Sequence, residues 1–262
     1  MSEPLLEVES LVTQYPGRRS MFSRARPAVR AVDQVSLSIS ASEIFGLVGE
    51  SGCGKSTLSR TLLGVQTETS GTIRLQGRVV SGLGPRAARE ARQAIQYVHQ
   101  DPAAALDPWW SIGATLEEGL KAAGIQSADE RRERILSMLS AVGIDSTMLR
   151  RYPHELSGGQ LRRIGIARIL ALHPRIVILD EPTSGLDLSV KATVLQLLRD
   201  LRDRFGMAYL LISHDLSVVE RLSERVAIMY LGRIVETAPT GALFRSPVHP
   251  YTRALLEAAP RL

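Results

Sequence analysis

An eight-residue stretch at positions 49–56 has the residue types and spacing of a phosphate-binding loop, Gly-x-x-x-x-Gly-Lys-Ser. It follows an apolar segment, 44–48, and precedes a helix-like segment that includes Leu58, whereas a flexible glycine-rich surface turn would require neither flank. Glycines let backbone amides turn toward phosphate oxygens, and the helix start adds positive partial charge. The motif predicts that Lys55 contacts the β- and γ-phosphates of a nucleotide and that the Ser56 hydroxyl binds Mg²⁺. The residues expected at the nucleotide are Gly49, Glu50, Ser51, Gly52, Cys53, Gly54, Lys55, Ser56 and Thr57.

Two apolar runs further along the chain end in residues that can hold a cation or move a proton. The first run, 176–179, is followed by Asp180 and Glu181, and the second, 209–212, leads to His214. Taken alone, an acid pair after an apolar run more often caps a helix, and a single histidine is more often an ordinary polar residue. Their interpretation therefore depends on the motifs around them.

A pentapeptide, Leu-Ser-Gly-Gly-Gln at 156–160, lies between the phosphate loop and the acid pair, and Pro-Thr-Ser-Gly-Leu-Asp follows that pair at 182–187. A glycine-rich helix start explains the small residues of the pentapeptide but not the match at all five positions. In this order, the motifs resemble the nucleotide-binding subunit of an ATP-binding-cassette (ABC) transporter, and the resemblance covers nearly the entire chain. It identifies a signature, formed by Leu156, Ser157, Gly158, Gly159 and Gln160, and a D-loop, formed by Ser184, Gly185, Leu186 and Asp187.

The resemblance implies catalytic and metal-binding roles for the remaining candidates. Glu181 would be the general base that polarises the attacking water, and His214 would contact the γ-phosphate. Gln100, in Val-His-Gln-Asp-Pro at 98–102, would sense Mg²⁺ and water and would hinge the helical lobe. The Mg²⁺ ion would be held by Ser56 and Gln100 together with Asp180, the last of them through a water molecule.

Further implications concern the adenine and the partner subunit. Tyr15 stands where the family stacks an aromatic ring on adenine. His99 stands where most relatives carry an aromatic residue. In the family, two subunits pack head to tail, and each signature caps the γ-phosphate bound by the other subunit. The helix that begins at the signature would point its positive end at that phosphate.

The segments that must position these residues alternate between strand and helix patterns, which predicts a parallel α/β sheet. Strands are expected at 6–12, 35–39, 44–48, 72–75, 95–98, 176–179, 209–212, 226–230 and 233–237, and helices after the phosphate loop and at 131–142, 159–172, 190–205 and the C-terminal end. With the resemblance, the expected fold is a P-loop NTPase (ABC ATPase) core with a parallel sheet, an N-terminal antiparallel β subdomain and an inserted α-helical subdomain. Residues 1–262 would form one ABC ATPase domain: 1–100 and 159–262 the RecA-like core with the β subdomain, and 101–158 the helical subdomain.

The composition is ordinary for a globular protein, with 44% hydrophobic and 23% charged residues among 262. No apolar run approaches the roughly 18 residues that span a bilayer, and the N-terminus lacks a signal-peptide pattern, so we expect a cytoplasmic chain. The single cysteine, Cys53, excludes an internal disulfide. The net charge is +5, but the arginines are spread along the chain, and we expect no nucleic-acid partner. The basic segment at 18–30 is interpreted as a solvated loop, with attraction to anionic lipid headgroups as the alternative.

Three stretches indicate a branch of the family: 46–58, Arg-Tyr-Pro-His-Glu at 151–155, and His-Pro-Tyr-Thr-Arg-Ala-Leu-Leu at 249–256. They resemble the dipeptide, oligopeptide and nickel importers, and particularly their second (F-type) ATPase subunit. The partners implied are a homologous ATPase subunit, expected to be a paralogue, two transmembrane permease subunits and an extracytoplasmic substrate-binding protein. The chain would lie peripherally on the cytoplasmic face of the inner (cell) membrane. Longer members continue into a cysteine-bearing extension that this sequence lacks, which removes the basis for predicting an iron–sulfur site.

The expected function is ATP hydrolysis that powers import of peptides, nickel or a related small solute. The alternative is a soluble or accessory ABC ATPase, for example of the phosphonate-utilisation type. An inactive binding module is disfavoured because Lys55, Asp180, Glu181 and His214 are all present.

Docking to a permease is expected in the groove beside Gln100, along residues 101–120. Trp109 and Trp110, after Pro108, are either the apolar surface of that dock or part of the core of the helical lobe.

Overall fold

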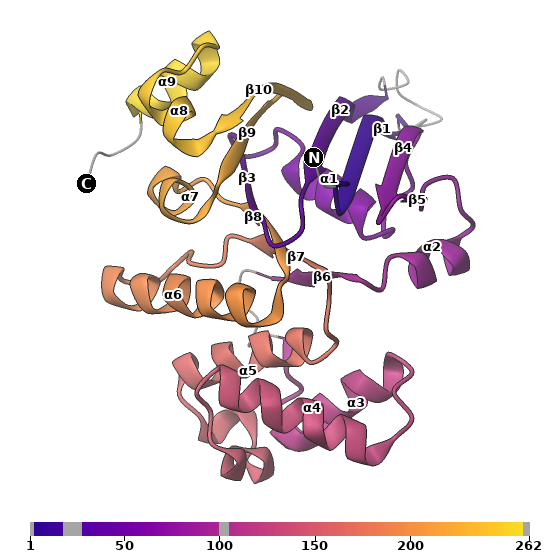
Figure 1. Ribbon diagram of the computed structural model, residues 1–262, viewed down its shortest axis with the longest axis vertical. Coiled ribbons are helices and arrows are strands. Elements are labelled where there is room, and N and C mark those ends of the chain that lie inside the picture. Colours follow the sequence, from indigo (N-terminus) through magenta and orange to yellow (C-terminus); the bar gives the residue numbers. More distant parts are fainter. Residues whose placement is uncertain (1–2, 18–27, 100–104, 259–262) are drawn as a thin grey trace, which may run out of the picture.

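The computed structural model describes residues 3–17, 28–99 and 105–258, which form two β-sheets and a group of helices (Figure 1). Gln100 and residues 18–27 of the basic segment lie outside the described residues. The predictions that concern them therefore stay predictions.

The first sheet is antiparallel and has the strand order β2 (Val29–Ile39), β1 (Leu6–Tyr15), β4 (Ser70–Leu75) and β5 (Arg78–Val79). In β1, Leu6, Val8 and Leu11 are buried, whereas Glu9 is exposed. This pattern arises because successive side chains of a strand point to opposite faces of the sheet. The buried face packs against α1 (Lys55–Leu62), whose Leu58 belongs to the same hydrophobic cluster.

The second sheet has six strands, of which five are parallel. Its order is β10 (Arg233–Pro239), β9 (Arg225–Tyr230), β3 (Ile44–Val48), β8 (Ala208–Ile212), β7 (Ile176–Asp180) and β6 (Ile95–Val98), with only β10 antiparallel to its neighbour. Every residue of β3 and β8 is buried, as expected for parallel strands that are covered on both faces. The carboxyl ends of the parallel strands meet at one edge, where an open α/β sheet binds ligands.

Side chains of β3 point alternately into two hydrophobic clusters, one on each face of the parallel sheet. Phe45 and Leu47 pack in the cluster that contains the antiparallel sheet and α1. Ile44 and Val48 face the other side and belong to the cluster that includes α6 (Leu188–Phe205) and the helical lobe. One strand therefore fixes the phosphate loop, which follows it, relative to both layers.

The helical lobe, residues 112–170, lies beyond α6 at the lower end of Figure 1. It contains α3 (Ile112–Ala122), α4 (Ala128–Ala141), the short 3₁₀ turns η2 (Ser146–Arg150) and η3 (Pro153–Glu155), and α5 (Gly158–Leu170). Ser111, Ser127 and Ser157 cap the three α-helices, because each side chain accepts a hydrogen bond from the backbone N–H three residues later. The remaining helices are α2 (Pro85–Ala91), α7 (Leu216–Leu222), α8 (Thr240–Arg245) and α9 (Pro250–Ala258).

The predicted fold class is confirmed: a parallel core sheet, an N-terminal antiparallel sheet and inserted helices are all present. The sequence analysis did not predict α2 or α7, since helices of seven residues are too short to display a repeating apolar face. Within the described part of the chain, no helix combines the length and the apolar character needed to cross a membrane. The proposed domain boundaries at residues 101 and 158 stay predictions.

Candidate functional site

The phosphate loop makes a tight turn between β3 and α1, and two of its positions have no space for a side chain. A Cβ atom at Gly54, where φ is 116°, would lie 2.1 Å from the carbonyl oxygen of Ala31. A Cβ atom at Gly49 would lie 2.2 Å from the carbonyl oxygen of Met229. Only glycine fits at these positions, because the loop backbone is pressed against both sheets.

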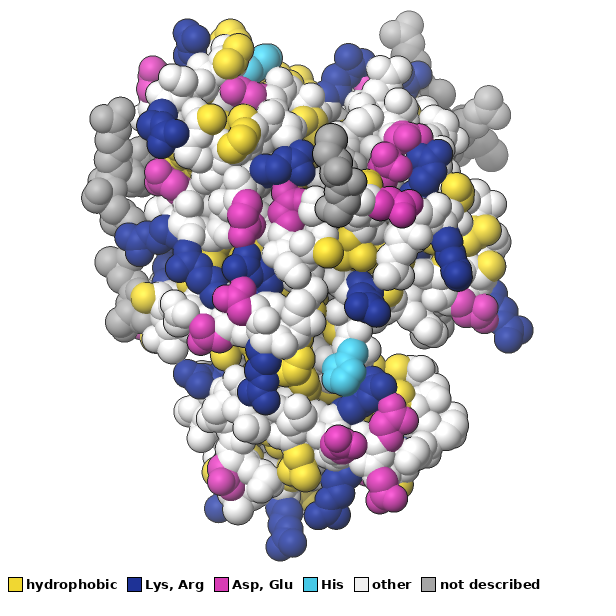
Figure 2. All heavy atoms as spheres, in the orientation of Figure 1, with side chains coloured by type: hydrophobic (Ala, Val, Ile, Leu, Met, Phe, Trp, Pro, Cys, Tyr) yellow, Lys and Arg dark blue, Asp and Glu magenta, His cyan; other side chains and the backbone are white. Residues whose placement is uncertain are grey.

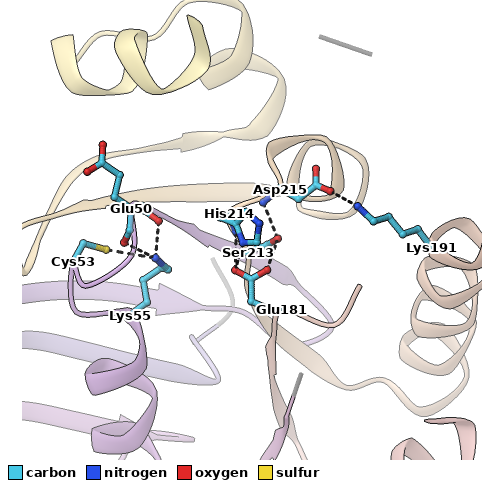
Figure 3. Close-up of polar contacts among 9 residues, drawn as sticks. Glu50, Cys53, Lys55, Glu181, Lys191, Ser213, His214 and Asp215 are labelled. Atoms are coloured by element: carbon cyan, nitrogen blue, oxygen red, sulfur yellow. Dashed lines mark hydrogen bonds and ion pairs between the residues drawn. The ribbon is translucent and has the colours of Figure 1, made fainter. Parts of the chain in front are cut away.

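Lys55 folds back over this loop (Figure 3). Its Nζ donates hydrogen bonds to the carbonyl oxygens of Gly49, at 2.6 Å, and Glu50, at 2.9 Å, and lies 3.7 Å from the Cys53 sulfur. These carbonyls are neutral acceptors. A phosphate group would offer the ammonium a stronger, charge-assisted partner.

A cleft of about 410 Å³ brings the phosphate loop together with both predicted acids. It is lined by Ala31, Ser51, Gly52, Gly54, Lys55, Ser56, Thr57, Tyr97, His99, Asp180 and Glu181. The motifs at 49–56 and 180–181, far apart in the sequence, thus share one concave site. Such convergence of polar groups in a cleft is what a ligand site requires.

Asp180, the last residue of β7, accepts a hydrogen bond from the hydroxyl of Tyr97 on the neighbouring strand β6. Burial and the Asp180 carboxylate raise the pKa of Tyr97, so its phenol stays protonated and remains a donor. The Tyr97 ring also meets His99 edge-on, with 4.5 Å between ring centroids. The carboxylate of Asp180 and the hydroxyl of Ser56 are oxygen ligands in one cleft, a donor set that fits Mg²⁺.

Glu181 and His214 contact each other directly (Figure 3). One oxygen of Glu181, Oε1, accepts hydrogen bonds from the backbone N–H of His214, at 3.0 Å, and from its Nδ1, at 2.6 Å. An ionised carboxylate can only accept, so in the tautomer that pairs with it Nδ1 is the donor. Ser213 adds a hydroxyl contact to the other oxygen of Glu181 at 3.5 Å.

The backbone of Glu181 has φ of 51°, an unfavourable conformation for a residue with a side chain. Its N–H donates to the carbonyl of Ile212 on β8 at 2.9 Å, which holds the residue in place. The unfavourable backbone conformation therefore occurs at the residue whose side chain contacts His214 and lines the cleft.

Of two further predicted site residues, Tyr15 and Gln100, only Tyr15 belongs to the described part of the chain. Tyr15, the last residue of β1, has its hydroxyl 3.4 Å from the Thr57 hydroxyl and therefore lies beside the phosphate loop. Its predicted stacking on adenine stays a prediction. Gln100 lies outside the described residues, although its neighbour His99 lines the cleft.

The signature and the D-loop meet in a second cleft, of about 800 Å³. Its lining includes Gly158 and Gly159 of the signature, Ser184, Gly185 and Leu186 of the D-loop, and side chains of α5 and α6. Ser157 and Gln160 bond to each other's backbone N–H, at 3.3 and 2.9 Å, and so fix the start of α5. Among the described residues that line the phosphate-loop cleft, none belongs to the signature.

The two tryptophans are exposed. The exposed fraction is 86% for Trp109 and 44% for Trp110. The backbone N–H of Trp109 donates to the carboxylate of Asp107 at 2.9 Å, within the turn that precedes α3. Their placement in the core of the helical lobe, one of the two alternatives raised by the sequence, is wrong.

Two family comparisons match this sequence. The ABC transporter family matches residues 32–184, and the family described as the oligopeptide/dipeptide transporter, C-terminal region, matches residues 235–262. The two matches leave out residues 1–31 and 185–234.

Individual relatives agree with these families. The chain is 48% identical over 260 residues to a probable peptide ABC transporter ATP-binding protein, y4tS, of Sinorhizobium fredii, covering 99% of this chain and 74% of that protein. It is 45% identical over 259 residues to the glutathione import ATP-binding protein GsiA of Pectobacterium atrosepticum, covering 99% of this chain but only 42% of that longer protein. Among solved structures, the ATP-binding cassette MJ0796, in a dimeric post-hydrolysis state bound to ADP and Pi, superposes with a TM-score of 0.74 at 25% identity, covering 90% of this chain and 98% of that one.

Proposed function

This chain belongs to the ABC transporter family of ATPases, and on that premise we propose that it hydrolyses ATP to power the import of a peptide or a peptide-like small solute. The observation that carries the chemistry is the single cleft in which the phosphate loop, Asp180 and Glu181 converge. The observation that carries the solute class is the match of the C-terminal region and of two relatives named for peptides and for glutathione, itself a peptide.

The cleft supports a division of labour among its residues. The loop amides and Lys55 bind the phosphates, with the ammonium moving from the carbonyls of Gly49 and Glu50 to the nucleotide. Ser56 and Asp180 would hold Mg²⁺, which when bound neutralises charge on the phosphates and polarises the transferred group. Glu181 accepts the proton of the attacking water as general base.

We infer that His214 acts in part through Glu181. Its Nδ1–H donates to the carboxylate and orients it. In the protonated imidazole Nε2 also carries a proton and can donate it in a hydrogen bond to the γ-phosphate. Its imidazole is 71% exposed, so a phosphate could approach it without displacing other protein groups. Gln100 completes the proposed catalytic set as the sensor of Mg²⁺ and water.

We propose that the second cleft belongs to the neighbouring subunit's ATP. The signature opens the helix α5, whose N-terminus carries positive partial charge, yet it lies apart from the phosphate loop of its own chain. A head-to-tail pair with a homologous ATPase subunit would bring each signature to the other's nucleotide. The dimeric state of the structurally similar cassette supports this pairing.

The remaining partners follow from the import function. They are two transmembrane permease subunits and an extracytoplasmic binding protein, with the ATPase lying on the cytoplasmic face of the membrane. The exposed Trp109 and Trp110 are the proposed anchor for a permease. The alternative, an accessory ATPase of the phosphonate type, is not favoured, because the relatives above carry the names of importer components.

This proposal includes no nucleic-acid partner. On the face shown in Figure 2, Lys and Arg side chains are interspersed with Asp and Glu rather than gathered into one stripe. Nucleic-acid binding draws on a continuous basic surface.

Affinity purification of the tagged chain from detergent-solubilised membranes, followed by mass spectrometry, tests the importer assignment. We expect two integral membrane subunits and a second ABC ATPase among the co-purifying proteins. Recovery with soluble proteins alone, from cells that express the permease genes, would contradict the assignment and favour the accessory ATPase.

A further inference from the structure

The peptide unit between Gly49 and Glu50, at the start of the phosphate loop, is held at both of its polar ends. Its carbonyl oxygen accepts the Lys55 ammonium at 2.6 Å. Its N–H donates to the hydroxyl of Tyr251, in the C-terminal helix α9, at 3.3 Å. The residues involved are about 200 positions apart in the sequence, so this contact joins the C-terminal region to the phosphate loop.

Tyr251 is itself firmly placed. Its ring packs on that of Tyr230, at the end of β9, with 4.2 Å between ring centroids. The turn before α9 is tied to β10, because the carboxylate of Glu236 accepts hydrogen bonds from the N–H groups of Val248, at 2.9 Å, and His249, at 3.0 Å. The ring nitrogen Nδ1 of His249 in turn accepts from the N–H of Tyr251 at 3.2 Å.

The peptide unit also lies close to strand β9. At Gly49 the backbone is so close to β9 that an added Cβ would meet the Met229 carbonyl at 2.2 Å. A rotation of the peptide plane would carry the carbonyl away from Lys55. The Tyr251 hydroxyl opposes that rotation from the other end of the same plane.

We propose that Tyr251 is a positioning residue for nucleotide binding: it fixes the Gly49–Glu50 peptide plane and thereby keeps the phosphate loop in its binding geometry. The inference rests on the proposed role of this loop in binding ATP. It assigns to the C-terminal region, the part of the chain that matches peptide transporters, a direct contribution to the ATP site. Burial raises the pKa of Tyr251, so the hydroxyl stays neutral and adds no negative charge near the phosphates.

Tyr251→Phe in the full chain tests the proposal, because it removes the hydroxyl and keeps the ring that packs on Tyr230. Loss of one hydrogen bond should raise the dissociation constant of ATP by about three- to tenfold. It should raise KM for ATP by a similar factor and leave kcat near the wild-type value, since Tyr251 touches none of the residues assigned to the chemical step. ATP binding is measured by titration calorimetry on the chain alone, and hydrolysis by phosphate release from the assembled pair of ATPase subunits.

Tyr230→Phe is the matched control, because it removes a hydroxyl from the other ring of the same pair. Weaker ATP binding in Tyr251→Phe alone, with a melting temperature without nucleotide within about 4 °C of the wild-type value, would support the proposal. Equal binding by Tyr251→Phe and wild type, or an equal loss in both variants, would overturn it. Wild-type chain that binds ATP poorly and indistinguishably from Lys55→Ala would instead contradict the proposed function of the loop.

Discussion

The hydroxyl of Tyr97 donates a hydrogen bond to the carboxylate of Asp180, across the neighbouring strands β6 and β7. This contact restrains the carboxylate that we propose to hold Mg²⁺. Mutation of a group that orients a metal ligand in this way typically lowers metal affinity or activity by about 10–100-fold.

Tyr97→Phe should therefore raise the Mg²⁺ concentration required for tight ATP binding, by roughly tenfold or more. The phenylalanine ring keeps the edge contact with His99, so the strand should remain in place. Mg²⁺ titrations of ATP affinity by calorimetry, and of ATPase rate, measure the effect. A variant whose Mg²⁺ dependence matches that of the wild type would show that the hydroxyl has no such role.

Lys55→Ala should abolish productive ATP binding, because the phosphates lose their direct cation. The loop itself should survive, since the side chain supports it through carbonyl acceptors that water can also satisfy. Equilibrium ATP binding measures the loss, and the circular dichroism spectrum serves as the folding control. Unchanged ATP affinity would count against the assignment of this loop.

Glu181→Gln should slow hydrolysis by about 10²–10⁴-fold and retain ATP binding, because it removes the general base. The amide oxygen of glutamine can still accept from the His214 N–H, so the local structure should persist. The ATP-bound dimer should then accumulate, which size-exclusion chromatography with ATP detects. Rapid hydrolysis by this variant would assign the base elsewhere.

Ser157→Arg should spare ATP binding by its own chain and block hydrolysis at the site that its signature caps on the partner. With Glu181→Gln, or the matching substitution in a paralogous partner, placed in the other subunit, both lesions fall on one shared site and one site stays active. With both substitutions in the same chain, each site carries one lesion and hydrolysis is lost. If the lesions placed in different subunits abolish hydrolysis at both sites, while both lesions in one chain leave one site active, head-to-tail sharing is ruled out.

Trp109→Ala and Trp110→Ala should uncouple ATP hydrolysis from transport, because they remove the exposed apolar side chains proposed to anchor the permease. Their melting temperatures should stay close to that of the wild type. Val65→Ala is a suitable control, since Val65 is also exposed (75%) but lies on the ATPase core after α1. Normal solute uptake by both tryptophan variants would place the dock elsewhere.

Much of this arrangement could be predicted from the sequence, because the relevant signals are local. The phosphate loop needs glycine at tight positions and a lysine at a helix start, and both requirements can be read from 49–56. The parallel strands have continuous apolar runs, and the expected strand at 95–98 coincides with β6. Short helices such as α7 escaped prediction because they lack a full apolar repeat.

Contacts that depend on strand register could not be predicted. Tyr97 pairs with Ile178 in the parallel register, and only this pairing brings its hydroxyl to Asp180. The Glu181–His214 contact likewise depends on the pairing of Asp180 with Ile212. Tyr251 stands in a stretch that the sequence analysis singled out for its family resemblance, but its position on the phosphate loop depends on how α9 packs against β9.

The placement of the signature and the phosphate loop on different clefts has a consequence for the unassembled subunit. Under the proposed pairing, a lone chain can hold ATP but lacks the group that completes hydrolysis. Newly made subunits would therefore bind ATP without hydrolysing it until they associate with a partner. Because one catalytic site is divided between two polypeptides, ATP hydrolysis would occur only after the subunits have assembled.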